Sequence, residues 1–241
     1  MLLSCDLAPT PHLRLFDQFA AAILPSGCTG ALYSGLEALA RPLSGAPGDE
    51  VLVNSSEDQI VYLAEGASKL VAHAPPAREQ VVAFHFSGDL LPLSARSAHA
   101  YSLCALTSCT LLVFPATRFL GAAQNEPVIL QGVLRRVLTA LHRSREKMVA
   151  LGRKTAPERV AGFLVTMAER IGSPCGHGCT LHLPMTRRDI ADNLGLTIET
   201  VSRQFGELRD LGLIETAGRS LVELRDVARL RQRAGHLAIP C

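Results

Sequence analysis

The sequence predicts an α+β fold with a β-rich first half and a helical second half that ends in a small β-hairpin. Short apolar runs separated by Gly, Pro, Ser and Asp fill residues 36–115, which is typical of an antiparallel β sandwich or barrel. A helical pattern replaces them from Val128 onwards, and two short helical segments with clear start signals follow. With 241 residues and 48% apolar composition, each half has enough apolar surface to form a core.

The first half alternates short strands with turns. The runs VLVN, QIVYLAEG, KLVAH, QVVAFHF and TLLVF each fit one strand. Turn signals lie between them at Pro47-Gly48-Asp49, Pro75-Pro76 and Gly88-Asp89, because Pro presets one backbone angle and Gly tolerates the left-handed region. We therefore expect antiparallel strands joined by tight turns.

A long helix is predicted from Val128 to about Leu151. Its apolar residues recur at alternating spacings of four and three, which is the heptad pattern of a helix that packs lengthwise on another. The seam consists of Leu130, Leu134, Val137, Leu141, Met148 and Leu151, with the small polar Ser144 in the remaining position. Such a seam pairs either with a second copy of itself or with the chain's own β half.

A further helix is predicted over residues 157–171. Pro157 suits its first turn, and Gly172 suits its end. Its apolar face consists of Val160, Phe163, Leu164 and Met167. Residues 173–180 are rich in Gly, Cys and Pro, so we expect a turn there.

Two short helices are predicted after Thr186 and Thr197. Thr186 and Asp189 have the spacing of a capping box, which satisfies free N–H groups at a helix start, and Gly195 marks the end of that helix. Thr197 can cap the second helix. The residues expected to point inward are Ile190, Leu194, Val201, Phe205, Leu208 and Leu211. Two short helices about a Gly-containing turn form a helix-turn-helix.

The outer face of the second helix carries Glu199, Thr200, Ser202 and Arg203 near its N-terminal end, the part that enters the major groove in such motifs. Arg203 can bond O6 and N7 of guanine, Glu199 can accept from N4 of cytosine, and Ser202 can do either. The alternative is an ordinary amphipathic helix with a solvated charged face.

A hairpin is predicted over residues 213–224, with its turn at Ala217-Gly218-Arg219, and makes the motif a winged one. The chain has 6 basic and 10 acidic residues up to Gln124, but 18 basic and 12 acidic residues after it, so the second half suits a polyanion. The side chains expected to contact DNA phosphates are Thr186, Arg187, Arg188, Thr200 and Arg219.

Two segments resemble the CRP/FNR superfamily of bacterial regulators. LPMTRRDIADNLGLTIETVSR, residues 183–203, closely resembles the helix-turn-helix of its FNR and FixK branches. FHFSGDL, residues 84–90, resembles the F-H-x-x-G-D-L turn of its sensor domain. The resemblance implies an N-terminal antiparallel β roll like that of cyclic-nucleotide-binding domains (1–124), a dimerisation helix (125–152) and a winged helix-turn-helix DNA-binding domain (153–241).

The resemblance also implies a function. We expect a transcription regulator that binds double-stranded DNA as a homodimer through the seam and works with RNA polymerase. The combination of Glu199, Ser202 and Arg203 resembles the branch that recognises TTGAT-type half-sites, which implies a TTGAT-N4-ATCAA-like palindrome. We expect an activator, although the residues alone do not separate activation from repression or identify target genes.

The signal that such a regulator senses is left open. Where cyclic AMP binders carry Gly-Glu-Leu, this chain has Gly88-Asp89-Leu90, and its Arg96-Ser97-Ala98 lies closer to that turn than in the family. An iron-sulfur cluster needs four thiolates, but only Cys5 and Cys28 lie near the N-terminus. The resemblance of residues 105–115 to the FNR-type sensors implies that Leu112 holds the position of their β-roll cluster ligand, although Cys104 and Cys109 are nearby.

Other ligands also stay open. Cys175, His177, Cys179 and His182 are soft ligands, but they lack a standard zinc spacing, and we assign no metal residue. His12 or His85 could serve as an axial haem ligand, as in some family members. A FixK-like regulator without a ligand, controlled by its own abundance, is the alternative, so the cofactor is unknown.

Several protein classes are excluded or disfavoured. The chain has no nucleophile elbow, phosphate loop or H-E-x-x-H, so we do not expect an enzyme. No apolar stretch is long enough to span a membrane, and Met1–Cys5 lacks the flanking regions of a secretory signal, so we expect a cytoplasmic protein with reduced thiols. The remaining alternative function is a ligand-, haem- or redox-sensing module whose activity does not depend on reading DNA.

Overall fold

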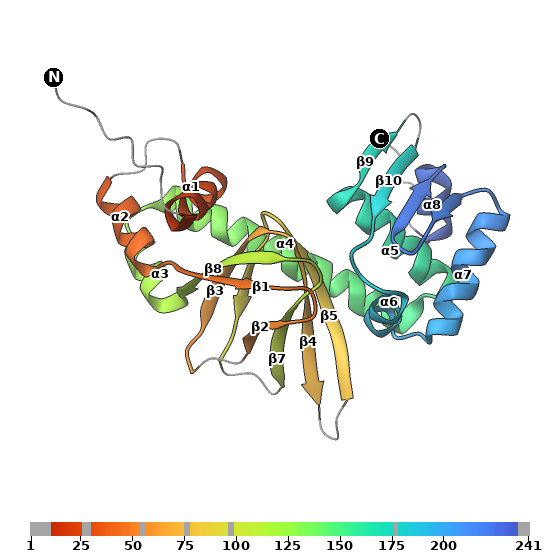
Figure 1. Ribbon diagram of the computed structural model, residues 1–241, viewed down its shortest axis with the longest axis horizontal. Helices are drawn as coiled ribbons and strands as arrows, with labels where there is room; N and C mark the ends of the chain where they lie inside the picture. The colour runs from red at the N-terminus through yellow and green to blue at the C-terminus, as the bar shows by residue number, and fades with distance from the viewer. Residues whose placement is uncertain are drawn as a thin grey trace. The chain divides into compact units, whose positions relative to one another are not determined.

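The computed structural model of the chain (Figure 1) describes residues 11–25, 30–53, 56–74, 78–95, 99–175 and 178–235. It confirms the α+β class, with antiparallel sheets first, a long helix, and a helical C-terminal part with its own small sheet. Contacts divide the described residues into two compact units. The first contains the residues up to Ser68 and His85–Ala140, and the second contains Lys69–Phe84 and the residues from Leu141 on.

The strands of the first half form two four-stranded sheets, in the orders β1-β8-β3-β6 and β2-β7-β4-β5. Their bounds are β1 Arg41–Gly45, β2 Glu50–Val53, β3 Gln59–Glu65, β4 Ala67–Ala74, β5 Arg78–Phe86, β6 Leu90–Leu93, β7 Ala100–Ala105 and β8 Cys109–Pro115. The pairs β1–β8, β3–β8, β3–β6 and β2–β7 are antiparallel, as the sequence predicts. Residues 59–64 of β3 are all buried, which explains why residues 60–64 appear in the sequence as a continuous apolar run.

Two of the predicted turns are confirmed. Gly48 connects β1 to β2 with φ 94°, and Gly88 connects β5 to β6 with φ 90°. In both turns the aspartate that follows the glycine accepts a hydrogen bond from the backbone N–H three residues before it. Asp49 accepts from Ala46, and Asp89 accepts from Phe86. The third expected turn, at residues 75–76, lies outside the described residues.

Three helices of the first unit were not predicted: α1 Pro11–Ile23, α2 Gly30–Leu39 and α3 Ala116–Ala123. The expectation of strands from residue 36 was therefore wrong at its start, because α2 continues to Leu39. Helices α1 and α3 pack on β3 and β8, α2 packs on α3, and together they complete an aromatic core. Its largest fully buried rings are Phe16, Phe19, Phe114 and Phe119, each with no exposed area.

The long predicted helix is α4, Pro127–Arg153. Ile129 and Val133 near its start are buried in the core of the first unit. Much of the rest is exposed, including the apolar Leu134, Val137, Leu138, Leu141, Met148 and Val149. Within the described ranges, no helix combines the length and the apolar character that crossing a membrane requires.

The C-terminal part contains α5 Ala156–Ile171, α6 Arg187–Leu194, α7 Ile198–Asp210 and α8 Val227–Arg233, with a sheet in the order β11-β12-β10-β9. Its strands are β9 Ser173–Cys175, β10 Gly178–His182, β11 Ile214–Ala217 and β12 Leu221–Leu224. The predicted helix over residues 157–171 is confirmed, and its apolar face is buried.

Two expectations for this part were wrong. Residues 173–175 and 178–180 are paired strands rather than a turn, because β10 also pairs with the distant β12, where Thr180 faces Glu223. Leu211 does not point inward. It caps the end of α7 and is 46% exposed.

Candidate nucleic-acid interface

The first helix of the motif begins as the sequence predicts. The Oγ1 of Thr186 accepts the N–H of Asp189 at 3.1 Å, and the carboxylate of Asp189 accepts the N–H of Thr186 at 2.8 Å. This reciprocal capping box fixes the start of α6. At the other end, Gly195 has φ 62° and ends the helix in the left-handed conformation.

The second helix is held by its own cap and by its apolar face. Thr197 accepts the N–H of Thr200 at 3.2 Å, which starts α7. Val201, Phe205 and Leu208 are at most 3% exposed and pack inward. Helices α6 and α7 contact each other across the turn at Gly195, so the helix-turn-helix is confirmed.

Glu199, Ser202 and Arg203 are all exposed in the first half of α7. A backbone N–H at the helix start and the Thr197 hydroxyl lower the pKa of Glu199, so its carboxylate is an acceptor at neutral pH. The Arg203 side chain is 69% exposed and lies 4.0 Å from the Glu207 carboxylate. A pair this exposed holds the guanidinium only weakly, so Arg203 can reorient toward a ligand.

The residues expected to contact phosphates differ in their surroundings. Thr186 and Arg188 are exposed at the start of α6, and Arg219 is exposed in the turn between β11 and β12. Arg187 instead lies over the ring of Phe205, with its Cζ 3.5 Å from the ring centroid. Thr200 is half-buried, and its hydroxyl is 3.1 Å from that of Thr197. Their contacts with DNA stay predictions.

The expected wing is present as a hairpin of β11 and β12. The two strands are antiparallel, with Thr216 opposite Val222, and Gly218 turns the chain with φ 64°. Arg209 near the end of α7 donates to the Thr216 hydroxyl at 3.2 Å, which joins the second helix to the wing.

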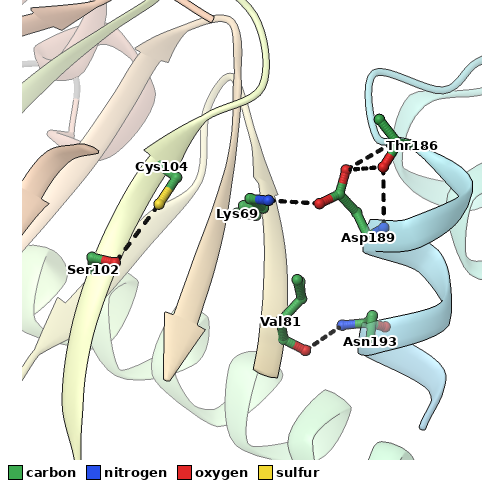
Figure 2. A network of polar contacts seen from close by, with 7 residues as sticks. All are labelled: Lys69, Val81, Ser102, Cys104, Thr186, Asp189 and Asn193. Carbon is green, nitrogen blue, oxygen red and sulfur yellow. Dashed lines mark hydrogen bonds and ion pairs between the residues drawn. The ribbon is translucent and has the colours of Figure 1, made fainter. Parts of the chain in front are cut away.

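Sequence reasoning missed a polar network on the buried face of α6 (Figure 2). The Lys69 amine of β4 lies 2.6 Å from Oδ1 of Asp189, and the Asn193 amide donates to the Val81 carbonyl of β5 at 3.1 Å. Burial alone raises the pKa of Asp189, but hydrogen bonds from Lys69 and Thr186 outweigh it and hold that pKa below its usual value. The available signal in the sequence was a pair of polar residues, Asp189 and Asn193, that lie one helical turn apart next to the apolar Ile190 and Leu194.

The candidate sensor residues do not assemble a metal centre in the part of the chain that the structure describes, where no three His, Cys, Asp or Glu side chains gather around a common point. Cys109, Cys175 and Cys179 are free thiols, and the Cys104 sulfur lies 3.7 Å from the Ser102 hydroxyl. His85 Nδ1 lies 3.5 Å from the Asp89 carboxylate, and His182 is exposed. Leu112 is fully buried. The remaining candidates lie outside the described residues or side chains: Cys5, His12, Cys28, Arg96, Ser97, Ala98 and His177.

Comparisons with known proteins agree with this geometry. The Crp-like helix-turn-helix domain matches residues 158–233. The nitrogen fixation regulation protein FixK of Bradyrhizobium diazoefficiens is 34% identical over 209 residues, which cover 86% of this chain and 88% of that protein. The transcriptional activator protein FnrL of Cereibacter sphaeroides is 32% identical over 213 residues, with 86% of each covered. The structure of FixK2 from Bradyrhizobium japonicum matches with a TM-score of 0.69 at 29% identity, over 80% of this chain and 96% of that one.

Proposed function

The chain belongs to the CRP/FNR family of transcription regulators, and from this premise we propose that it binds a TTGAT-N4-ATCAA-like palindrome as a homodimer and activates transcription. Its relatives and the Crp-like domain identify it as a FixK/FNR-like DNA-binding regulator rather than an enzyme. The particular site, the dimer and the activation are the proposal.

The observation that carries the proposed site is the exposed group of Glu199, Ser202 and Arg203 on a helix that is fixed at its start. Arg203 can bond O6 and N7 of the guanine in TTGAT, and Glu199 can accept the N4 amino group of a cytosine. We propose that Ser202 contacts the neighbouring base edge. Thr186, Arg187, Arg188, Thr200 and Arg219 then contact the phosphates that set the register of α7.

The proposed dimer is supported by the apolar face of α4. Leu134, Val137, Leu141 and Met148 of the predicted seam are 38–62% exposed in the single chain. Leu130 is partly buried in the first-unit core, and Leu151 faces Gly195, where an added Cβ would lie 3.3 Å from its Cδ2. We propose that the four exposed residues pack against the same residues of a second copy. Within this proposal, residues 1–124 form the sensor-like domain, 125–152 the dimerisation helix and 153–241 the DNA-binding domain.

Activation is proposed from the relatives. FnrL of Cereibacter sphaeroides and AadR of Rhodopseudomonas palustris carry activator names, and AadR is 36% identical over 184 residues. An activator of this kind works in the cytoplasm beside RNA polymerase, which we propose as the protein partner.

Fluorescence anisotropy on labelled duplexes tests the site. The protein should bind a TTGAT-N4-ATCAA duplex at least about 1,000-fold more tightly than a duplex of the same composition with scrambled half-sites, at physiological salt. Glu199→Ala should lose most of this difference. Arg229→Ala is the control, because Arg229 is exposed on α8, which packs on α5 outside the proposed DNA surface. Equal affinity for the two duplexes would contradict the proposed site.

A further inference from the structure

The hairpin formed by β4 and β5 carries an inference about how the DNA-binding helices are held. Its residues 69–84 belong to the same compact unit as residues from 141 on. We propose that this hairpin, although it belongs by sequence to the proposed sensor-like domain, supports the DNA-reading helices, and that Lys69 is a positioning residue, which holds the start of α6 through Asp189. The inference rests on the proposed DNA-binding function.

The two oxygens of the Asp189 carboxylate contact different partners, Thr186 at the start of α6 and Lys69 of β4. Oδ2 accepts the N–H and the hydroxyl of Thr186, at 2.8 and 2.6 Å, and so closes the cap of α6. Oδ1 lies 2.6 Å from the Lys69 amine, with the Asp189 side chain 8% exposed (Figure 2). Asp189 is buried while the Lys69 side chain is 27% exposed, so removing Lys69 leaves a buried carboxylate with less compensation, which costs more than losing an exposed pair. The cap therefore depends on Lys69.

A second set of contacts fixes the same face of α6 to β5. The Asn193 amide donates to the carbonyls of Val81 at 3.1 Å and Val82 at 3.4 Å. The Lys147 amine of α4 donates to the same two carbonyls, at 3.1 Å and 2.6 Å. Asn193 follows Asp189 by four residues, so both lie on one face of the helix. The hairpin thus holds α6 at its first and last turns.

The base of the hairpin is anchored to α5. The guanidinium of Arg170 donates to the Phe84 carbonyl at 2.7 Å, and the rings of Phe84 and Phe163 meet edge-on with their centroids 6.1 Å apart. Side chains of α4, α5 and α6 all bond to residues of this hairpin, which belongs to the same compact unit as these side chains.

The position of the α6 start matters for reading DNA. Thr186 and Arg188 at this end are proposed phosphate contacts, which set the register of α7 on the bases. Loosening the Asp189 cap should therefore reduce binding to the specific site more than binding to random DNA. If Lys69 contacted a phosphate directly, its substitution would instead weaken binding to specific and random DNA equally. It would also lower the slope of log affinity against log salt by about one.

Three variants test the proposal by anisotropy at several KCl concentrations. Lys69→Met should weaken binding to the palindrome about tenfold, with a clearly smaller loss on the scrambled duplex and an unchanged slope of log affinity against log salt. Lys69→Arg should restore the affinity, because it restores the cation at Asp189. Arg188→Gln is the matched control for a phosphate contact, and it should weaken both duplexes alike and lower the slope.

Hydrogen exchange on the free protein separates this inference from the proposed function. The N–H groups of Asp189 and Ile190 are bonded to Thr186, so Lys69→Met should speed their exchange while Lys69→Arg leaves it slow. Unchanged exchange, or loss of salt slope in Lys69→Met, would overturn the positioning role. If the wild-type protein binds neither duplex, the proposed function is wrong. The exchange result then still tests whether Lys69 stabilises the start of α6. Lys69→Gln replaces Lys69→Met if thermal unfolding shows that the latter does not fold.

Discussion

Adjacent residues in the helix-turn-helix face different environments. Arg187 packs over the Phe205 ring, while its neighbour Arg188 is exposed. Gln204 is 4% exposed and bonded to Glu207, while its neighbour Arg203 faces solvent. A helix rotates by about 100° per residue, so one step along the chain takes a side chain from a packed environment to an exposed one. Substitutions at such neighbours should therefore have different consequences.

Arg203→Ala and Arg188→Ala make this difference measurable. Arg203→Ala should relax discrimination at the guanine of each half-site by about 1 to 3 kcal/mol, because it removes a bidentate base contact. Arg188→Ala should weaken binding to every sequence alike and lower the salt slope by about one. The measurement is the affinity for duplexes with each half-site base replaced in turn. Equal losses on specific and random duplexes for Arg203→Ala would refute its base-reading role.

Lys147 should give the stability of the protein a distinct pH dependence. Burial lowers its pKa from 10.5 to about 8, although two carbonyls accept from its amine. Between these pH values the unfolded chain binds the proton that the folded chain has lost, so the free energy of unfolding rises with pH. Below pH 8 both states hold the proton, and the buried charge lowers stability.

The comparison of wild type with Lys147→Met isolates this effect. The difference in free energy of unfolding between the two proteins should shift in favour of the wild type by about 2 to 3 kcal/mol from pH 7 to pH 10. Urea unfolding at a series of pH values measures it, and the titration of all other groups cancels in the difference. A difference that stays constant with pH would show that the Lys147 amine is solvated.

At the scale of elements, the turn of the helix-turn-helix depends on a glycine that the sequence itself identifies. Gly195 has φ 62°, and an added Cβ would lie 3.3 Å from the Leu151 side chain. Gly195→Ala should therefore destabilise the protein by about 1 to 2 kcal/mol. Gly206→Ala is the control within α7, where an added Cβ approaches nothing closer than 3.8 Å, and it should stabilise by about 0.5 to 1 kcal/mol. Thermal unfolding distinguishes the opposite signs, and a shared sign would contradict the role given to the turn.

The elements that the sequence predicts well are those with local signals. The cap at Thr186, the left-handed Gly195 and the cap at Thr197 each depend on residues within four positions, and all three are present. The same holds for the turns at Gly48 and Gly88. Local hydrogen bonds fix these features whatever the rest of the chain does, so their residues can be recognised in isolation.

The elements that were missed depend on distant partners. β9 and β10 are strands because β12 provides a pairing edge, and nothing in residues 173–180 indicates that partner. The role of Lys69 likewise depends on Asp189, which is 120 residues away. The end of helix α2 was overlooked because residues 36–39 were assigned to the short apolar runs expected of strands, and no element was predicted over α1 or α3. The exposed residues of α7 that are proposed to read DNA were easier to place, because a capped amphipathic helix fixes which residues face outward.

At the scale of the whole molecule, the exposed apolar face of α4 requires an explanation. Leu134, Val137, Leu141 and Met148 repeat along one helix at heptad positions, and each is more than a third exposed. Soluble chains rarely leave an apolar stripe of this kind to water. A second copy that presents the same stripe would bury both, and its twofold symmetry matches the symmetry of a palindrome.

Leu141→Glu should convert the protein from dimer to monomer. The substitution places two carboxylates against each other in the seam of the dimer, whereas in a single chain Leu141 is 44% exposed and tolerates a charge. Binding to the palindrome should fall at least about 100-fold, because two linked half-site contacts become independent ones. Sedimentation velocity measures the mass and anisotropy the affinity. Val128→Glu is the control, because Val128 is 58% exposed on the same helix but outside the seam. A Leu141→Glu protein that stays dimeric would show that another surface forms the dimer.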